Sequence, residues 1–172
     1  MREFALLLSI VVAFCCVPPA SAAGEITRLS AQEQSSWLRH LLPLPQRIRI
    51  PRAVTVPADD VVLTLAEGAG DVERQAASEI EGLFAEHGAG DLEDGSFEVL
   101  LGVCDASGSI GDRAIPGAEG LADLPNADQA YVIVPLDDDT LALAGPALKG
   151  AYYAARTLCQ LLRPAFDGAN LT

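Results

Sequence analysis

The sequence predicts an α+β domain, with a mixed sheet of about five strands and helices packed mainly on one face of that sheet. Three observations support this fold class. Short apolar runs rich in β-branched residues are separated by stretches with helical periodicity. The two kinds of element do not alternate strictly, so a doubly wound fold is disfavoured. The last third of the chain reads strand, strand, helix.

The first predicted helix covers residues 31–42. Ser30 and Glu33 have the spacing of a capping box, and apolar residues follow at helical spacing, namely Trp37, Leu38, Leu41 and Leu42. Pro43 and Pro45 end this helix. Ile48 and Ile50 then alternate with arginines, which predicts a half-buried strand that continues in extended form through Val54 and Val56. Pro51 within this stretch indicates a break or an edge position.

In the middle of the chain, the sequence pattern predicts a strand at 61–65, then a glycine turn and a helix, and then a strand at 97–103. We expect Asp71 to be the N-cap of the helix. The apolar face of this helix is predicted to hold Val72, Ala76, Ile80, Leu83 and Phe84. Its solvent face is predicted to hold Glu73, Glu79, Glu81 and Glu86.

The last third begins with residues 105–129, a stretch rich in Gly, Asp and Ala without periodicity. We expect a loop with at most a short helical turn, which either has a function or covers part of the fold. Strands at 131–136 and 140–144 follow, joined by an acidic turn. The closing helix, 147–162, places six residues on one apolar stripe: Ala147, Ala151, Ala154, Leu158, Leu161 and Leu162.

The N-terminus has the pattern of an export signal. Arg2 precedes an uncharged apolar run over residues 4–17, and Ala20-Ser21-Ala22 suits signal peptidase. The apolar run is shorter than the roughly 20 residues that a membrane helix needs. We therefore expect residues 1–22 to be cleaved and the protein to be secreted or periplasmic, with no membrane attachment afterwards. One domain is expected over 23–164, and a linker over 165–172.

The chain is strongly acidic, with a net charge of −13. Nucleic acids and anionic membrane surfaces are disfavoured as partners, because phosphate contacts need a surplus of Lys and Arg. The basic residues gather early in the chain, at Arg28, Arg39, Arg47, Arg49 and Arg52. They form either a strip that docks a neighbouring domain or, as we favour, an ordinary surface on which alternating Arg47 and Arg49 are the solvent face of a strand.

Two cysteines, Cys104 and Cys159, remain in the chain once the predicted signal at 1–22 is removed. Export would permit a disulfide between them, and two separately buried thiols fit the sequence equally well. His40 and His87 stand apart from both cysteines in the sequence, so no zinc-binding spacing is present.

Three motifs invite a catalytic or binding interpretation, and each has a better structural one. Gly68-Ala69-Gly70 resembles a phosphate-binding turn, but Glu73 stands where a third glycine belongs. Ser107 and Ser109 lack the spacing of a nucleophile elbow. Residues 137–139 are three aspartates without the calcium-loop pattern. We therefore predict no catalytic, cofactor-binding or metal-binding residues and no cofactor.

Aromatic residues near the start of the closing helix could stack on a sugar. Packing is the favoured interpretation for Tyr152 and Tyr153, with Gly150 letting the helix approach the sheet. Trp37 is also expected to pack inward, because it lies on an amphipathic helix.

The segment 131–162 is similar to the end of the small N-terminal domain of family 20 glycoside hydrolases and related α-glucuronidases. The similarity rests on Tyr131 at the strand start, Gly150-Ala151-Tyr152-Tyr153-Ala154 at the helix start, and Thr157-Leu158 with Gln160-Leu161-Leu162 at its end. The family often has Glu-Gly before the tyrosine, whereas this chain has Gln129-Ala130. In that family the catalytic Asp-Glu pair belongs to a following barrel, and this sequence contains no Asp-Glu dipeptide.

The resemblance implies a noncatalytic accessory domain of a secreted β-N-acetylhexosaminidase-like glycoside hydrolase. Its partner would be a catalytic barrel absent from this sequence, and we expect no hydrolysis by this chain alone. The alternative is a stand-alone carbohydrate- or protein-binding module that recognises glycans or a protein through the loop at 105–129.

Overall fold

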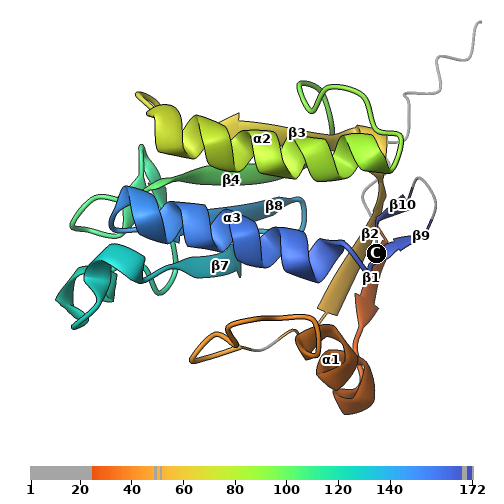
Figure 1. The fold of residues 1–172 in the computed structure, drawn as a ribbon, viewed down its shortest axis with the longest axis horizontal. Coiled ribbons are helices and arrows are strands. Elements are labelled where there is room, and N and C mark those ends of the chain that lie inside the picture. The colour runs from red at the N-terminus through yellow and green to blue at the C-terminus, as the bar shows by residue number, and fades with distance from the viewer. Residues whose placement is uncertain (1–24, 49, 51, 168–169, 172) are drawn as a thin grey trace, which may run out of the picture.

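A four-stranded mixed sheet forms the centre of the computed structural model (Figure 1). Its strand order is β3-β4-β8-β7. β3 (Val61–Leu65), β4 (Phe97–Val103) and β8 (Thr140–Gly145) are parallel, whereas β7 (Val132–Pro135) runs antiparallel to β8. The structure describes residues 25–167 except 49 and 51, together with 170 and 171. The α+β prediction is confirmed, with four strands in the main sheet where about five were expected.

Two long helices cover one face of this sheet, as predicted. They are α2 (Asp71–Glu86) and α3 (Leu148–Leu162), which lie side by side in Figure 1. Side chains alternate between the two faces along each strand. Leu101 and Leu143 are fully buried on the helix side, whereas Leu100, Ala142 and Ala144 are buried on the opposite side.

The long segment between β4 and β7 covers the second face of the sheet. It contains β5 (Ser109–Ile110), β6 (Arg113–Ala114) and two short helices, η2 (Leu121–Asp123) and η3 (Ala127–Gln129). Ile110, Ile115, Ala118 and Leu121 from this segment are buried against the strands. The expectation that such a loop would cover something is met, because its apolar side chains complete a second core.

The two ends of the described chain together form a second sheet, of order β1-β2-β10-β9. Its strands are β1 (Glu25–Arg28), β2 (Arg52–Pro57), β9 (Phe166–Asp167) and β10 (Asn170–Leu171), and η1 (Ala58–Asp60) leads from β2 into β3. The predicted signal at 1–22 lies outside the described residues. None of the described helices is long and apolar enough to cross a membrane.

The first helix, α1 (Ala31–Leu38), has the predicted capping box. The Ser30 hydroxyl accepts the Glu33 N–H at 3.3 Å, and the Glu33 carboxylate accepts the Ser30 N–H at 2.7 Å. The prediction that this helix continues to residue 42 was wrong. Leu41 is buried, whereas the Leu42 side chain is 80% exposed and its backbone N–H and C=O both bond the amide of Gln160.

The predicted strand around Ile48 and Ile50 is not observed, because both residues lie outside every strand. Arg49 and Pro51 are outside the described residues. A proline lacks the N–H that a sheet ladder needs, and Pro45 and Pro51 flank this stretch. The extended pattern therefore becomes a strand only at β2, which pairs with β1.

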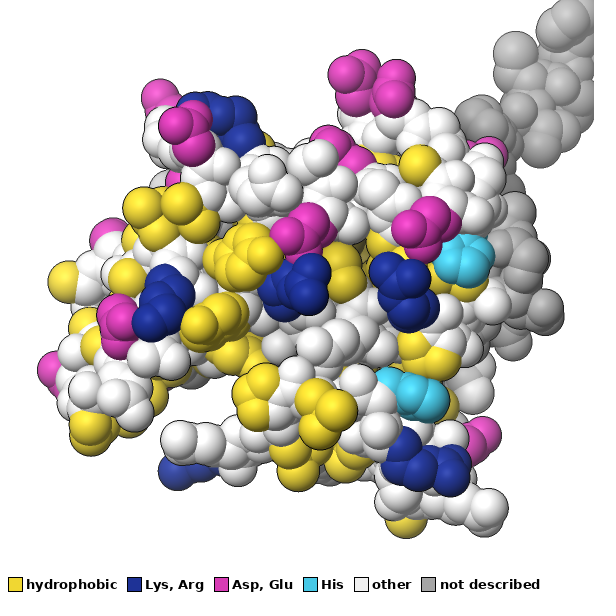
Figure 2. All heavy atoms as spheres, in the orientation of Figure 1, with side chains coloured by type: hydrophobic (Ala, Val, Ile, Leu, Met, Phe, Trp, Pro, Cys, Tyr) yellow, Lys and Arg dark blue, Asp and Glu magenta, His cyan; other side chains and the backbone are white. Residues whose placement is uncertain are grey.

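Ion pairs at a constant spacing join the two parallel helices. Arg156 contacts Glu79 at 2.7 Å and Arg163 contacts Glu86 at 3.3 Å, and both pairs span 77 positions. The Tyr152 hydroxyl also donates to Glu79, at 2.7 Å. In Figure 2 the Lys and Arg side chains form a row along α3 with acidic side chains beside them. The acidic groups of α2 therefore match the basic groups of α3 along the line where the two helices meet.

Two glycines allow α3 to approach the sheet closely. A Cβ on Gly150 would overlap the carbonyl oxygen of Ala130. A Cβ on Gly145, at the end of β8, would lie 2.6 Å from the N atom of Ala151. No larger residue fits at either position without moving the helix away from the strands.

The first prediction concerns this close approach. Gly150→Ala should lower the free energy of unfolding by about 1–3 kcal/mol, because the added methyl group forces α3 away from Ala130. Gly82→Ala in α2 is the matched control, since nothing lies within 4 Å of the position that its methyl group would take. The control should stabilise the protein by about 0.5–1 kcal/mol. Urea denaturation of both variants tests the prediction, and equal effects would contradict it.

The second prediction concerns the pH dependence of the helix pair. Burial acts to raise the pKa of Glu79, but hydrogen bonds from Arg156 and Tyr152 outweigh it and hold the pKa below its usual range. A lowered pKa in the folded state stabilises the protein above the unfolded value of about 4.3, and this contribution is lost as pH falls through the folded value. Glu79→Gln should therefore destabilise the protein at pH 7.

The difference between Glu79→Gln and the unmodified protein should shrink when urea denaturation is repeated at about pH 3.5. Glu81→Gln is the control, because Glu81 is exposed on the same helix. A difference of the same size at both pH values would show that the carboxylate charge does not contribute.

Candidate functional site

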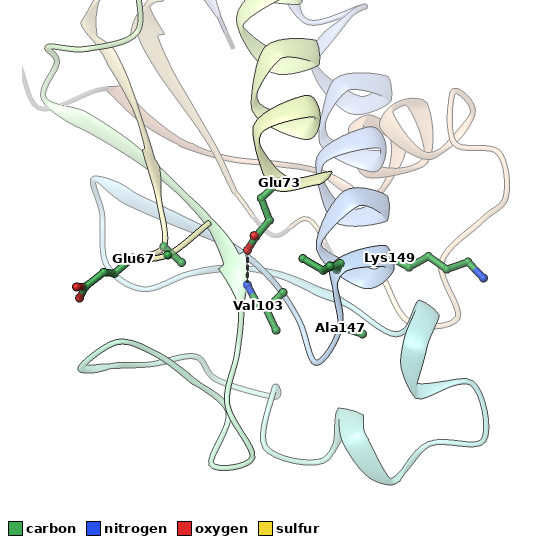
Figure 3. A pocket seen from close by; sticks show the side chains of 8 residues that line it. Glu67, Glu73, Val103, Ala147 and Lys149 are labelled. Carbon is green, nitrogen blue, oxygen red and sulfur yellow. Dashed lines mark hydrogen bonds between the residues drawn. The ribbon is translucent and has the colours of Figure 1, made fainter. Parts of the chain in front are cut away.

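A hollow of the described structure lies where the parallel strands end. It has a volume of about 660 Å³ and is lined by Ala66, Glu67, Gly68, Glu73, Val103, Ala147, Leu148 and Lys149 (Figure 3). Ligands of open α/β sheets bind at this edge. The N-termini of α2 and α3 both lie here, and each carries a partial positive charge. This hollow is therefore the candidate functional site of the described structure.

The turn from β3 into α2 shapes one side of the hollow. Gly68 has a φ of +77°, which glycine adopts without strain. The N-cap of α2 is Gly70, so the prediction of Asp71 as the cap was wrong. Asp71 is the first helical residue, and its fully exposed carboxylate pairs with Arg74 at 2.8 Å. The structural interpretation of the Gly68-Ala69-Gly70 turn agrees with this geometry.

Glu73 fills the place that an anion would take at the start of α2. One carboxylate oxygen accepts the Gly70 N–H at 2.6 Å, and the other accepts the Val103 N–H at 3.3 Å (Figure 3). Glu73 is only 4% exposed, so its placement on the solvent face was wrong. Val72 is correspondingly 40% exposed instead of packed inward. The carboxylate of Glu73 joins the helix to β4.

The other charged side chains of the hollow point away from it. Figure 3 shows Glu67 and Lys149 directed outward on opposite sides. Lys149 pairs with Asp128 at 3.2 Å and lies 6.0 Å from the centre of the Tyr153 ring. The described residues that line the hollow include no serine, cysteine or histidine. They place one carboxylate, already bonded to backbone amides, at the positive end of a helix.

The structure does not bring the serines and histidines together. Asp105 accepts the Ser107 hydroxyl at 2.7 Å and the backbone N–H of Ser109 at 2.9 Å, and these bonds lower its pKa. The two serines therefore belong to a turn that follows β4. His87 caps the far end of α2 and stacks on Phe166 with ring centres 4.0 Å apart.

The acidic turn at 137–139 is held by protein contacts. Asp138 pairs with Arg52 at 2.6 Å, and Asp137 accepts the Asp139 N–H at 3.2 Å. Within the described part of the chain, no group of three or more metal-binding side chains gathers.

The two cysteines are free thiols on opposite faces of the sheet. Cys104 belongs to the core under the long segment, whereas Cys159 packs on the helix side. The sheet between them excludes the disulfide that the sequence left open. Burial raises the pKa of the Cys159 thiol to about 11, so it is a weak nucleophile.

The aromatic residues pack as predicted near the start of α3. Tyr152 packs against the helix-side core, and its ring centre is 6.3 Å from that of Tyr153. The Tyr131 hydroxyl forms a hydrogen bond of 2.8 Å with the Thr157 hydroxyl. Trp37 is half-buried on α1.

Comparison with known proteins does not assign the chain to a family. No model of a protein family matches the chain, and no curated protein matches it. One solved structure with a similar chain path is described as a "GH138 enzyme targeting pectin rhamnogalacturonan II". The identity is 12% and the TM-score is 0.42, over 58% of this chain. The match spans 10% of that enzyme, and the activity and substrate in its description belong to that enzyme.

The third prediction tests the structural role of Glu73. Glu73→Gln should lower the free energy of unfolding by about 1–3 kcal/mol, because the amide has one acceptor oxygen for two backbone donors. Glu81→Gln, an exposed change on the same helix, should alter it by less than about 0.5 kcal/mol. Chemical denaturation at pH 7 measures both values. If Glu73→Gln is as stable as Glu81→Gln, the structural role assigned to the Glu73 carboxylate is wrong.

Proposed function

We propose that this chain is a noncatalytic accessory domain of a secreted, β-N-acetylhexosaminidase-like glycoside hydrolase. In this proposal it braces a catalytic barrel that is absent from the sequence. The carboxylates that act on substrate would belong to that barrel, and this domain would supply a rigid surface beside it.

One observation carries the proposal. The residues behind the family resemblance fix α3 against the residues just before β7 and against the segment after α1. Gly150 contacts the Ala130 carbonyl, Tyr131 bonds Thr157, and Gln160 holds the backbone of Leu42. Their side chains serve the packing of a scaffold instead of lining the hollow. Residues used in this way fit a bracing role better than a catalytic one.

The long segment at 104–130 also favours a brace over a stand-alone binding module. Its large apolar side chains Ile110, Ile115 and Leu121 are buried against the sheet. Leu124 is 47% exposed. A binding loop would instead present several apolar or aromatic side chains to solvent.

The fourth prediction tests bracing directly. The chain is fused before a family 20 β-N-acetylhexosaminidase barrel from which the native N-terminal domain has been deleted. We expect the fusion to raise the melting temperature of the barrel by several degrees, because an interdomain surface is buried again. A fusion that carries Gly150→Ala should raise the melting temperature of the barrel by a smaller amount. A barrel that melts at the same temperature with and without the chain would contradict the proposal.

The isolated chain provides the control for catalysis and for sugar binding. It should leave chromogenic N-acetylglucosaminides intact, and turnover that follows the protein through purification would overturn the noncatalytic assignment. Calorimetry against chito-oligosaccharides and uronic-acid glycans should show no saturable heat. Saturable binding would favour the stand-alone module instead.

A further inference from the structure

One stretch of the chain has a charge opposite to that of the whole molecule. Residues 34–58 contain four arginines and no aspartate or glutamate, although the net charge of the chain is −13. The sequence left two interpretations of the arginines open, a docking strip or a surface that includes the solvent face of a strand. Ile48 and Ile50 lie outside every strand, so no strand accounts for the arginines beside them.

The arginines nearest to α1 have no acidic partner. Arg39 and Arg47 are exposed, and within the described residues no carboxylate lies within ion-pair distance of either. Arg52, in contrast, serves the fold, because it pairs with Asp138 at 2.6 Å. Residues 39–47 are named the basic segment below. The charge of the basic segment is therefore available to a partner.

The basic segment also presents two strongly exposed apolar side chains. Leu42 is 80% exposed and Leu44 is 58% exposed, whereas every other exposed large apolar side chain of the described residues is less than half exposed. In Figure 2, apolar side chains lie on this surface below α3, with basic side chains on either side. Scattered single apolar residues are normal on a surface, but neighbouring ones with a polar rim mark an interaction site.

The exposure of Leu42 is fixed by the fold. Its neighbour Leu41 is buried, so the backbone cannot rotate without removing Leu41 from its packing. The Leu42 N–H donates to Oε1 of Gln160 at 2.9 Å, and the Leu42 carbonyl accepts from Nε2 of Gln160 at 3.1 Å. These bonds join the basic segment to α3. A surface that is already held in place binds a partner with little ordering cost.

The direction of β10 leads toward the same surface. β10 is antiparallel to β2, with Asn170 opposite Pro57 and Leu171 opposite Val56. It therefore runs toward the first residue of β2, Arg52, which follows the basic segment closely in the sequence. A domain joined after this chain would begin on that side of the molecule.

We propose that the basic segment is the surface on which the catalytic barrel of the proposed function docks. The barrel would meet Leu42 and Leu44 with an apolar patch, and Arg39 and Arg47 with carboxylates, because the charges of an interface are complementary. This inference rests on the proposed function, since it takes the barrel as the partner. A second copy of the chain is disfavoured in this place by its net charge of −13.

The apolar centre is tested in the fusion to a family 20 barrel that lacks its own N-terminal domain. Leu42→Ser is compared with Leu124→Ser, which changes an exposed leucine far from the basic segment in the sequence. We expect Leu42→Ser to remove about half or more of the gain in the barrel's melting temperature, because few residues carry most of an interface. Leu124→Ser should keep the gain. Equal gains in the two fusions would overturn the docking surface.

The charge is tested in the same fusion with Arg47→Gln. This variant should reduce the gain in melting temperature, whereas Arg74→Gln, at an exposed arginine of α2, should not. The gain of the unmodified fusion should also shrink in about 1 M salt, because the screening length there is about 3 Å. If Arg47→Gln and Arg74→Gln have the same effect, the acidic partner surface is wrong.

Hydrogen exchange followed by mass spectrometry separates a failure of this inference from a failure of bracing. Peptides from residues 39–47 should exchange more slowly in the fusion than in the isolated chain. Protection elsewhere on the domain, with 39–47 unchanged, would overturn the docking surface and leave bracing intact. A fusion with no protection and no gain in melting temperature would contradict bracing, and the docking surface with it.

The isolated chain tests the other occupants of the basic segment. We expect a monomer in sedimentation equilibrium and no saturable heat with uronic-acid glycans. A dimer that Leu42→Ser disrupts would assign the segment to a second copy of the chain. Saturable glycan binding that Arg47→Gln removes would assign it to an anionic sugar. Either result would overturn the barrel as the partner.

Discussion

The close contact between α3 and the end of the central sheet is the constraint on which the rest of the fold depends. Gly145 and Gly150 leave no room for a Cβ, so the start of the helix lies directly against β8 and the carbonyl of Ala130. α2 packs beside α3 through its buried apolar face, and Glu79 and Glu86 pair with Arg156 and Arg163 along the junction. The helix-side core then closes between the two helices and the strands.

The same arrangement explains why a carboxylate of the chain itself lies at the start of α2, beside the hollow at the strand ends. Two parallel helices direct their positive ends to one edge of the sheet, which in other folds binds an anion. Here the chain supplies its own anion, the carboxylate of Glu73, which bonds the N–H groups of Gly70 and Val103. The Glu73 carboxylate thereby joins α2 to β4. A helix end that could bind an external anion is used here to hold two elements together, as a scaffold requires.

Much of the fold could be predicted from the sequence, because local patterns determine it. β3 and β4 begin and end at the predicted residues, and α2 was predicted with its N-cap one residue too late. The burial of Glu73 could not be predicted from helical spacing, because it depends on β4, a neighbour distant in the sequence. The one available signal was a glutamate at the third helical position after a glycine, where it can accept the N-cap amide. Other features also depended on contacts between distant segments. The residues at 104–130 have no sustained periodicity, yet Ile110, Ile115 and Leu121 converge on one face of the sheet because turns, a two-residue strand and a short 3-10 helix direct them.

The most direct test of the central claim is native-state hydrogen exchange along α3 and β8. If the last helix locks the scaffold, the amides of Ala142, Ala144, Ala154 and Leu158 should exchange only through global unfolding, with the largest protection in the protein. Amides of α1, a helix with no buried residue, should exchange much faster. Exchange in α3 as fast as that in α1 would show that this helix is not the element that holds the domain together.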